Sequence, residues 1–310
     1  MSTKSHAFLI VYTLPLEIEA ELKLDNKMKL AAVVVVYNMD TDKVVENIKT
    51  YGDKVDVLIV WDNTEARVRE WSTLMHFRKD TIVIQNGCNI GLARAYNNAN
   101  QIAREHGCTH LMTMDQDSSF VNFDSYRKQI IDDGITGVGV NRSDWQQLSA
   151  HEVSLTCQSG STFPIAMLED IGGFRDDFFI SMVDADICLN AEAHGYRILE
   201  AGECMINHQI GSGRKVRVLG HNVEVSDYTA LRHYYDSRNR ILMWYLYPDD
   251  CGFHFKIHHF VGRMKVMLKI LLFEQDKYHK TMAIVRGTYN GLRNKYIPYD
   301  KSSIVKRNAH

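Results

Sequence analysis

The sequence predicts an α/β protein organised around a mostly parallel β-sheet flanked by helices. Three apolar, β-branched runs, at 30–37, 55–61 and 81–85, alternate with segments of helical length. A run that is apolar at nearly every position is typical of a strand covered on both faces, and strands that alternate with helices favour right-handed βαβ units. Ligands of such sheets bind at the carboxyl ends of the strands.

The later elements follow from weaker patterns. Alanines at a spacing of four before Gly107 predict a helix, and an apolar strand comes next. After Gly139 the alternation weakens, and loops, short strands and one more helix favour a second lobe that completes a cleft. The expected strands span 30–37, 55–61, 81–85 and 110–114, and the expected helices span 42–51, 92–106 and 186–195.

The composition is that of a folded globular chain. Of its 310 residues, 45% are hydrophobic and 24% are charged, which excludes disorder as the organising principle. The six cysteines include no C-x-x-C pair, so a zinc knuckle or a redox dithiol is excluded. We therefore expect buried thiols in a reducing, cytoplasmic compartment.

The two ends of the chain differ from its main part. An apolar stretch at 7–13 is soon followed by three glutamates, unlike a secretory signal, and we expect residues 1–27 to form an extension or hairpin before the main domain at 28–250. The segment 253–273 is rich in apolar residues, but four basic residues interrupt it, so we do not expect it to cross a membrane.

The C-terminal region, 251–310, is strongly basic. It holds 12 Lys or Arg against 3 Asp or Glu, whereas the whole chain has a net charge of -2. Apolar residues recur there at helical spacing, which suits a helix lying in the headgroup layer of an anionic membrane or one packed on the protein body or a second subunit. The acidic body offers no extended basic groove, so we expect no nucleic acid partner. The apolar positions are Ile257, Val261, Met264, Leu268, Leu271 and Leu272.

Two aspartates follow the expected strand at 110–114. Asp115 and Asp117 bracket one residue, so in an extended chain both side chains project to the same face. Such a pair can hold Mg²⁺ or Mn²⁺, which prefer oxygen ligands and keep positions open for substrate phosphates. D-x-D pairs also occur on solvated loops without a metal.

Polar clusters end the neighbouring strands as well. Asp62 and Asn63 could accept from a nucleobase N–H and a ribose hydroxyl, or form an Asx turn. The segment 89–97 places Gly91 at a helix start, where free N–H groups favour phosphate, and Arg94 adds positive charge. The segment lacks the G-x-G-x-x-G pattern, which disfavours a nicotinamide enzyme.

The region after Gly139 contributes more titratable groups. Asp184 and Asp186 lie against apolar flanks, which raise the pKa of a carboxylate and make it a better base. Asp186 could instead be a helix N-cap. His208, one of 14 histidines, could be a ligand or an ordinary histidine.

From about Leu30 to Asn239 the chain resembles the family 2 glycosyltransferases with the GT-A (nucleotide-diphospho-sugar transferase) fold, and especially bacterial rhamnosyltransferases. Nine blocks occur in the matching order, and the D-Q-D-S form of the D-x-D motif indicates the rhamnosyltransferase branch. The blocks are VVVVYN (33–38), WDNT (61–64), NIGLARAYN (89–97), LMTMDQDSS (111–119), SGS (159–161), IGGF (171–174), FFISMVDADICLNAEAHGYRI (178–198), HQIGS (208–212) and YYDSRN (234–239).

The resemblance implies roles for matching residues. Asp115, Asp117 and His208 would hold the metal, Mn²⁺ or Mg²⁺, and Asp184 would be the catalytic base. The residues that would hold the nucleoside and the rest of the donor are Tyr37, Asp62, Asn63, Asn89, Gly91, Arg94, Asn97, Asp115 and Gln116. Those that would lie near the acceptor or the diphosphate are Ser159, Gly160, Asp186, Arg238 and Asn239.

The activity that the resemblance implies is an inverting, metal-dependent transfer of L-rhamnose from dTDP-rhamnose to a saccharide acceptor, lipid-linked, in the synthesis of a cell-surface polysaccharide. Departures from the rhamnosyltransferase pattern at Ser181 and Asn190 leave the sugar and acceptor open. The alternatives are another UDP- or dTDP-sugar such as galactofuranose or a hexosamine, a nucleotidyltransferase, and a noncatalytic carbohydrate-binding protein. The oligomeric state is open.

Overall fold

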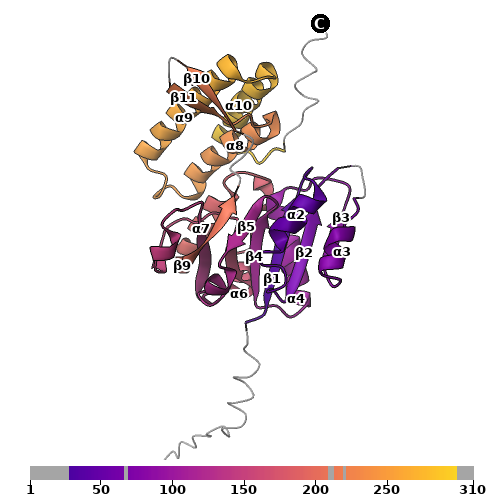
Figure 1. Ribbon diagram of the computed structural model, residues 1–310. Helices are drawn as coiled ribbons and strands as arrows, with labels where there is room; N and C mark the ends of the chain where they lie inside the picture. Colours follow the sequence, from indigo (N-terminus) through magenta and orange to yellow (C-terminus); the bar gives the residue numbers. More distant parts are fainter. Residues whose placement is uncertain (1–27, 66–68, 209–212, 219–220, 299–310) are drawn as a thin grey trace, which may run out of the picture.

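The computed structural model describes residues 28–65, 69–208, 213–218 and 221–298 (Figure 1). The extension expected at 1–27 lies outside these residues, as do positions 209–212 of the HQIGS block. Among the described helices, none is long and apolar enough to cross a membrane.

A single large sheet lies at the centre of the molecule. In the described part of the chain its strand order is β3-β2-β1-β4-β8-β6-β9-β5, with β7 pairing to β9. The first four strands of this order are mutually parallel, and β8, β5 and β7 pair in antiparallel fashion. The strands are β1 (Leu30–Val36), β2 (Val57–Asp62), β3 (Ile82–Gln85), β4 (His110–Asp115), β5 (Ser118–Val121), β6 (Gly134–Val140), β7 (His151–Glu152), β8 (Ser161–Pro164) and β9 (Arg197–His208).

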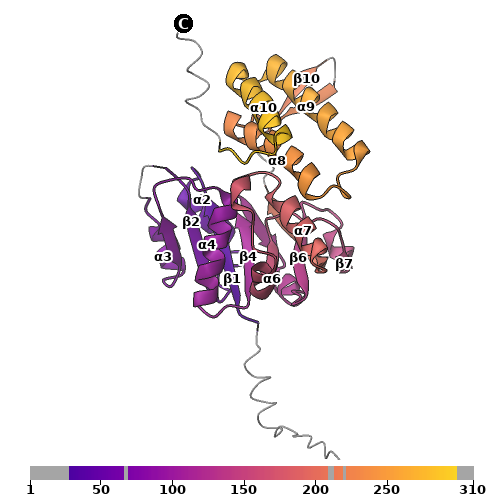
Figure 2. The ribbon, with the colours of Figure 1, turned by 180° about the vertical axis from the view of Figure 1, so that it is seen from behind.

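Helices cover both faces of this sheet, as Figures 1 and 2 show from opposite sides. Alternate residues of β1 explain why: Ala31, Val33 and Val35 face one buried cluster, and the residues between them face another. The helices are α2 (Thr41–Ile48), α3 (Ser72–Phe77) and α5 (Phe123–Arg127) on one face and α4 (Leu92–Glu105), α6 (Ile165–Asp170) and α7 (Val183–Ala193) on the other, with short 3₁₀ turns η1 (Trp145–Gln147) and η2 (Asp176–Phe178).

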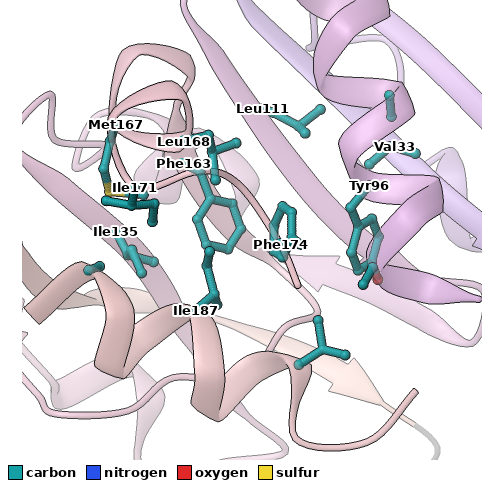
Figure 3. Close-up of a cluster of buried hydrophobic side chains, with 14 of the residues drawn as sticks. Val33, Tyr96, Leu111, Ile135, Phe163, Met167, Leu168, Ile171, Phe174 and Ile187 are labelled. Atoms are coloured by element: carbon teal, nitrogen blue, oxygen red, sulfur yellow. The ribbon is translucent and has the colours of Figure 1, made fainter. Parts of the chain in front are cut away.

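The cluster on the α4 side joins the two halves of the chain. Phe174 packs its ring 5.2 Å from the ring of Tyr96 and 5.2 Å from that of Phe163 (Figure 3). Ile187 from α7 points into the same cluster. The loop before α7 is thereby packed against α4, which brings the segment that carries Asp184 to the parallel half of the sheet.

The predicted α/β class, with a mostly parallel central sheet flanked by helices, is confirmed. The predicted second lobe after Gly139 is wrong. β6, β8 and β9 belong to the same sheet, because β8 pairs with both β4 and β6, and β9 pairs with both β6 and β5. The helix expected at 186–195 begins three residues earlier, at Val183.

A smaller module lies over the carboxyl edge of the sheet (Figure 1). Its helix α8 packs against α10 and α9, so the module includes α8 even though the boundary predicted from composition lies at 250. It consists of the hairpin β10 (Arg214–Val218) and β11 (His221–Val225) and the helices α8 (Ala230–Leu246), α9 (Phe253–Phe273) and α10 (Lys277–Leu292), which confirms the predicted helical C-terminal extension.

Glycines set the distance between α8 and α10. A Cβ on Gly287 would lie 2.3 Å from the carbonyl oxygen of Tyr234, and one on Gly291 would lie 2.9 Å from that of Arg238. Because these atoms are backbone, they cannot move aside without separating the helices. The close approach of α8 and α10 therefore requires both glycines.

We predict that Gly287→Ala destabilises the protein by about 1–3 kcal/mol, because the added methyl group overpacks the α8–α10 contact. The matched control is Gly262→Ala in α9, where nothing lies within 4 Å of the new Cβ. This control should be neutral or stabilising by up to about 1 kcal/mol, since alanine favours helix more than glycine does. Urea unfolding followed by circular dichroism measures both, and equal effects would contradict the packing argument.

Candidate metal and nucleotide site

Three side chains from distant parts of the chain meet at the carboxyl edge of the sheet. Asp115 ends β4, Asp117 follows in the turn to β5, and His208 ends β9. One ligand atom of each lies within 4.8 Å of the others. The antiparallel pairing of β5 with β9 places Ser118 opposite His208 and so brings the histidine to the aspartates.

His208 is held firmly in this position. Its Nδ1 lies 3.3 Å from Asp117 Oδ1, 3.9 Å from Asp115 Oδ2 and 2.8 Å from Ser118 Oγ. The side chain of Asn141 donates to the His208 carbonyl at 2.7 Å and accepts from its N–H at 3.0 Å. The hydrogen bond with Asp117 raises the pKa of His208 against the opposing effect of burial.

The carboxyl of Asp115, whose side chain is 29% exposed, has a raised pKa. The pKa is about 6, chiefly because of partial burial; the negative charges of Asp117 and Asp184 contribute to the rise, and His208 acts in the opposite direction. Two carboxylates and an imidazole within reach of one point form a donor set that fits a divalent cation such as Mn²⁺ or Mg²⁺. The cation would also offset the repulsion that raises the pKa of Asp115.

Neighbouring side chains fix the turn that carries the aspartates. Ser159 Oγ accepts a hydrogen bond from the Asp115 N–H at 3.1 Å. Gln116 accepts from the Tyr37 N–H at 2.8 Å through its side chain, and from Asn47 Nδ2 at 2.9 Å through its carbonyl. Gly160 adopts φ +80 beside Ser159 and would clash with Val138 if it carried a Cβ. Ser159 and Gln116 therefore hold the backbone of the site, and the ring of Tyr37 stays 42% exposed beside it.

Asp62 ends β2, and its two carboxylate oxygens differ in their hydrogen bonds. Its Oδ1 accepts from the Thr64 N–H at 3.0 Å and pairs with Arg69 at 3.4 Å. Its Oδ2 has no hydrogen-bond partner among the described residues, although Asp62 is only 2% exposed. A buried carboxylate oxygen without a donor is costly, so this atom is suited to accept from a ligand.

Asn63 and Asn89 shape the turn before α4. Asn63 donates to the Gly91 carbonyl at 3.2 Å, and Asn89 Oδ1 accepts from the Gly91 N–H at 3.0 Å. The next N–H, of Leu92, donates to the carbonyl of Phe179 at 2.6 Å. These N–H groups, expected to be free for phosphate, are thus already engaged within the protein.

Arg94 and Asn97 both contact the loop that follows α6. Asn97 donates to the Phe174 carbonyl and to Asp176, each at 2.7 Å, and accepts from the Phe174 N–H at 2.9 Å. Arg94 pairs with Asp176 at 3.2 Å in a partly exposed contact. In this structure both side chains hold the loop, and their predicted place on the path to the diphosphate stays a prediction.

The loop before Asp184 has a strained backbone. Phe179, Ser181 and Met182 have φ of 59, 67 and 63, a region that non-glycine residues rarely adopt. The Ile180 N–H donates to the Phe178 carbonyl at 2.6 Å, which closes a tight turn around Phe179. Backbone strain of this kind persists only where the surroundings enforce it.

Two residues of α8 enforce this loop conformation. Asn239 Nδ2 donates to the carbonyls of Phe178, Ile180 and Ser181 at 2.9, 3.0 and 2.9 Å. Arg238 donates to the Asp177 and Ile297 carbonyls. Both side chains are 0% exposed and bind these carbonyls in the structure, and their approach to the diphosphate or acceptor stays a prediction.

The two aspartates of α7 differ in their surroundings. Asp184 is half-buried, and its negative charge raises the pKa of Asp115. Asp186 is only 3% exposed and accepts from Arg175 at 3.1 Å and Tyr247 at 2.9 Å. Asp186 therefore ties α7 to neighbouring segments, and the N-cap position belongs to Met182.

Arg232, in the first turn of α8, is a site residue that the sequence did not indicate. Its positive charge lowers the pKa of both Asp115 and His208, and its guanidinium lies 4.1 Å from the ring centre of Tyr228. A cation facing this cluster from the C-terminal module suits an anionic ligand. The signal that could have found it is its position two residues before the YYDSRN block.

No protein-family model matches the chain, and no curated protein matches it in sequence. Among solved structures, it is similar to S. aureus TarS at 13% identity, covering 91% of this chain and 46% of that chain with a TM-score of 0.46. A structure of TarS 1-349 gives 14% identity over 85% of this chain and 71% of that one, with the same TM-score of 0.46. A 4-diphosphocytidyl-2C-methyl-D-erythritol synthase gives 15% identity, 57% and 89% coverage and a TM-score of 0.38. The chain spans less than half of the longer TarS structure, and likenesses this distant assign no activity.

We predict that Mn²⁺ binds at least about tenfold more weakly at about pH 5 than at about pH 7.5. The pKa of Asp115 lies at about 6 and that of His208 is raised, so both ligands take up protons as the pH falls and compete with the cation. Calorimetric titration at the two pH values measures this effect.

The same titration at about pH 7.5 should show no Mn²⁺ binding to Asp117→Asn. Asp132→Asn is the control, because that side chain is 95% exposed and its one ion pair within the described residues is with His110 at 3.3 Å. An affinity that is the same at both pH values would argue against this ligand set.

Proposed function

We propose that the protein is an inverting glycosyltransferase that uses a divalent metal and moves a sugar from a nucleoside diphosphate to a hydroxyl group of a saccharide. The observation that carries the proposal is the cluster of Asp115, Asp117 and His208 at one edge of the sheet, together with Asp184, whose charge raises the pKa of Asp115. This arrangement would supply a cation site for a diphosphate and a separate carboxylate for an incoming alcohol.

The nucleoside would bind beside the ends of β1 and β2. The unpartnered Oδ2 of Asp62 would accept from an N–H of the base, and the exposed ring of Tyr37 would pack against the base. Asn63 and Asn89 would act indirectly, since they shape the turn before α4.

In the reaction, Asp184 would take the proton of the acceptor hydroxyl as its oxygen attacks the anomeric carbon. Asp184 Oδ1 accepts from the Ala185 N–H at 2.9 Å, which leaves Oδ2 for this proton. Asp115, Asp117 and His208 would hold Mn²⁺ or Mg²⁺, which when bound would stabilise the negative charge of the departing diphosphate. Arg232 would add positive charge on the side of the C-terminal module.

Among donors we propose dTDP-L-rhamnose, with another UDP- or dTDP-sugar as the alternative. The acceptor would be a saccharide, lipid-linked, in the synthesis of a cell-surface polysaccharide. The support for rhamnose is the D-Q-D-S motif at 115–118. The reaction would take place in the cytoplasm, where the six cysteines would stay reduced. All six are free and four of them are buried, whereas Cys88 is exposed, contrary to the expectation of buried thiols.

The deciding experiment offers two reaction mixtures with Mn²⁺, one of candidate nucleotide-sugars with a saccharide acceptor and one of nucleoside triphosphates with a sugar phosphate, and identifies the leaving group. A glycosyltransferase releases a nucleoside diphosphate, whereas a nucleotidyltransferase releases pyrophosphate. A noncatalytic carbohydrate-binding protein would give neither product and no metal-dependent binding of nucleoside diphosphate by calorimetry.

We predict that Asp184→Asn lowers the rate of transfer by about 10² to 10⁴, because the amide cannot accept the acceptor proton. Binding of the nucleoside diphosphate with Mn²⁺ should stay within about threefold of wild type, since Asp184 is not a ligand in this proposal. Transfer assays and calorimetry separate the two effects. A variant that transfers at a near wild-type rate would remove Asp184 from the role of base.

We predict that Asp62→Asn weakens nucleoside diphosphate binding by about tenfold or more. The amide keeps an oxygen at Oδ1 for the Thr64 N–H but replaces the unpartnered Oδ2 with a donor, which would face the N–H of the base. Calorimetry with uridine and thymidine diphosphates measures the change. Unaltered affinity for both would show that the base binds elsewhere.

A further inference from the structure

Helix α9 presents a continuous apolar face to solvent. At about 100° per residue, its eight most exposed apolar side chains fall within an arc of about 120° and extend over about 30 Å of the helix. Their exposure ranges from 43% to 73%. They are Phe253, Ile257, Phe260, Val261, Met264, Leu268, Leu271 and Leu272, and we call this face the α9 stripe.

The opposite face of α9 is anchored to the protein. His259 and Ile270 are buried, and the ring of His259 lies 5.3 Å from that of Trp244 in α8. Arg263 pairs with Asp236 of α8, and Lys269 donates to the Glu224 carbonyl of β11 at 2.8 Å. The stripe is therefore not the face of α9 that packs on the body. Packing on the body, one of the alternatives that the sequence left open, does not account for these apolar side chains.

The charged side chains of α9 are all basic. Helical periodicity places Lys265 along one flank of the stripe and Lys256 along the other, and Lys269, beyond Lys265, is held by the Glu224 carbonyl. The segment 253–273 contains no Asp or Glu. Two copies that met through this face would bring like charges together without acidic partners, which disfavours a second copy as the occupant.

We propose that the α9 stripe docks on the surface of an anionic lipid bilayer, with the helix lying in the plane of the headgroups. Phenylalanine and leucine side chains would enter the acyl boundary while lysines contact anionic headgroups, as amphipathic interfacial helices do. This inference depends on the surface of α9 and not on the transferase reaction.

Flotation of the full-length protein with vesicles tests the proposal, without donor or acceptor. Wild type should bind vesicles of phosphatidylcholine mixed with phosphatidylglycerol, more weakly at high salt and more weakly to phosphatidylcholine alone. The double variant Phe260→Glu/Leu268→Glu should bind at least about tenfold more weakly. Lys265→Gln should weaken binding to the anionic vesicles by about fivefold.

The matched control is Leu155→Glu, because Leu155 is 53% exposed, close to the 57% of Leu268, but lies outside the C-terminal module. It should bind vesicles like wild type. The wild-type lipid and salt series needs no variant and guards against misfolding. Absence of wild-type binding to anionic vesicles, equal loss in the control, or a stable dimer that the stripe substitutions dissociate would each overturn the proposal.

Discussion

The pairing of β5 with β9 is the contact on which the candidate site depends. It is short, with Ser118 opposite His208 at its end, yet it joins the turn that carries Asp115 and Asp117 to a histidine some ninety positions later in the chain. Because the register of a strand pair decides which face each side chain takes, a shift of one residue would turn His208 away from the aspartates. The hydrogen bonds of Asn141 to the backbone of His208 reinforce this register.

A second constraint comes from the C-terminal module. Asn239 and Arg238 on α8 bind the carbonyls of the loop before α7, and the ring of Phe179 stacks on Tyr235 at 4.8 Å. On its other side the same loop closes over Gly91, whose missing Cβ leaves room for Phe179. The position of Asp184 thus depends jointly on α4 and α8. Arg232 precedes these residues on α8, so the helix that supports the loop also brings positive charge to the cluster.

The sequence predicted what depends on local pattern. β1, β2 and β4 are buried on both faces, so most of their residues are apolar, and the aspartates that end β2 and β4 could be recognised. β9 could not be recognised in this way, because exposed and half-buried residues interrupt its buried ones, and it pairs with β6 in parallel and with β5 and β7 in antiparallel fashion. For this reason the segment after Gly139, which includes β9, was expected to form a second lobe. The structural contacts of Arg238 and Asn239 could not be predicted for a related reason: polar residue types suggest ligand contact, and only the tertiary structure shows that these side chains bind backbone carbonyls.

The left-handed backbone at Phe179, Ser181 and Met182 has a consequence for how this chain distributes stability. Glycine would adopt these angles at little cost, so each side chain kept there gives up folding free energy that a glycine would recover in part. The benefit is that the start of α7 is restricted to a narrower range of positions, because a side chain limits the backbone conformations that a glycine would allow. In this loop, a substitution that raises thermostability would therefore also loosen the positioning of Asp184.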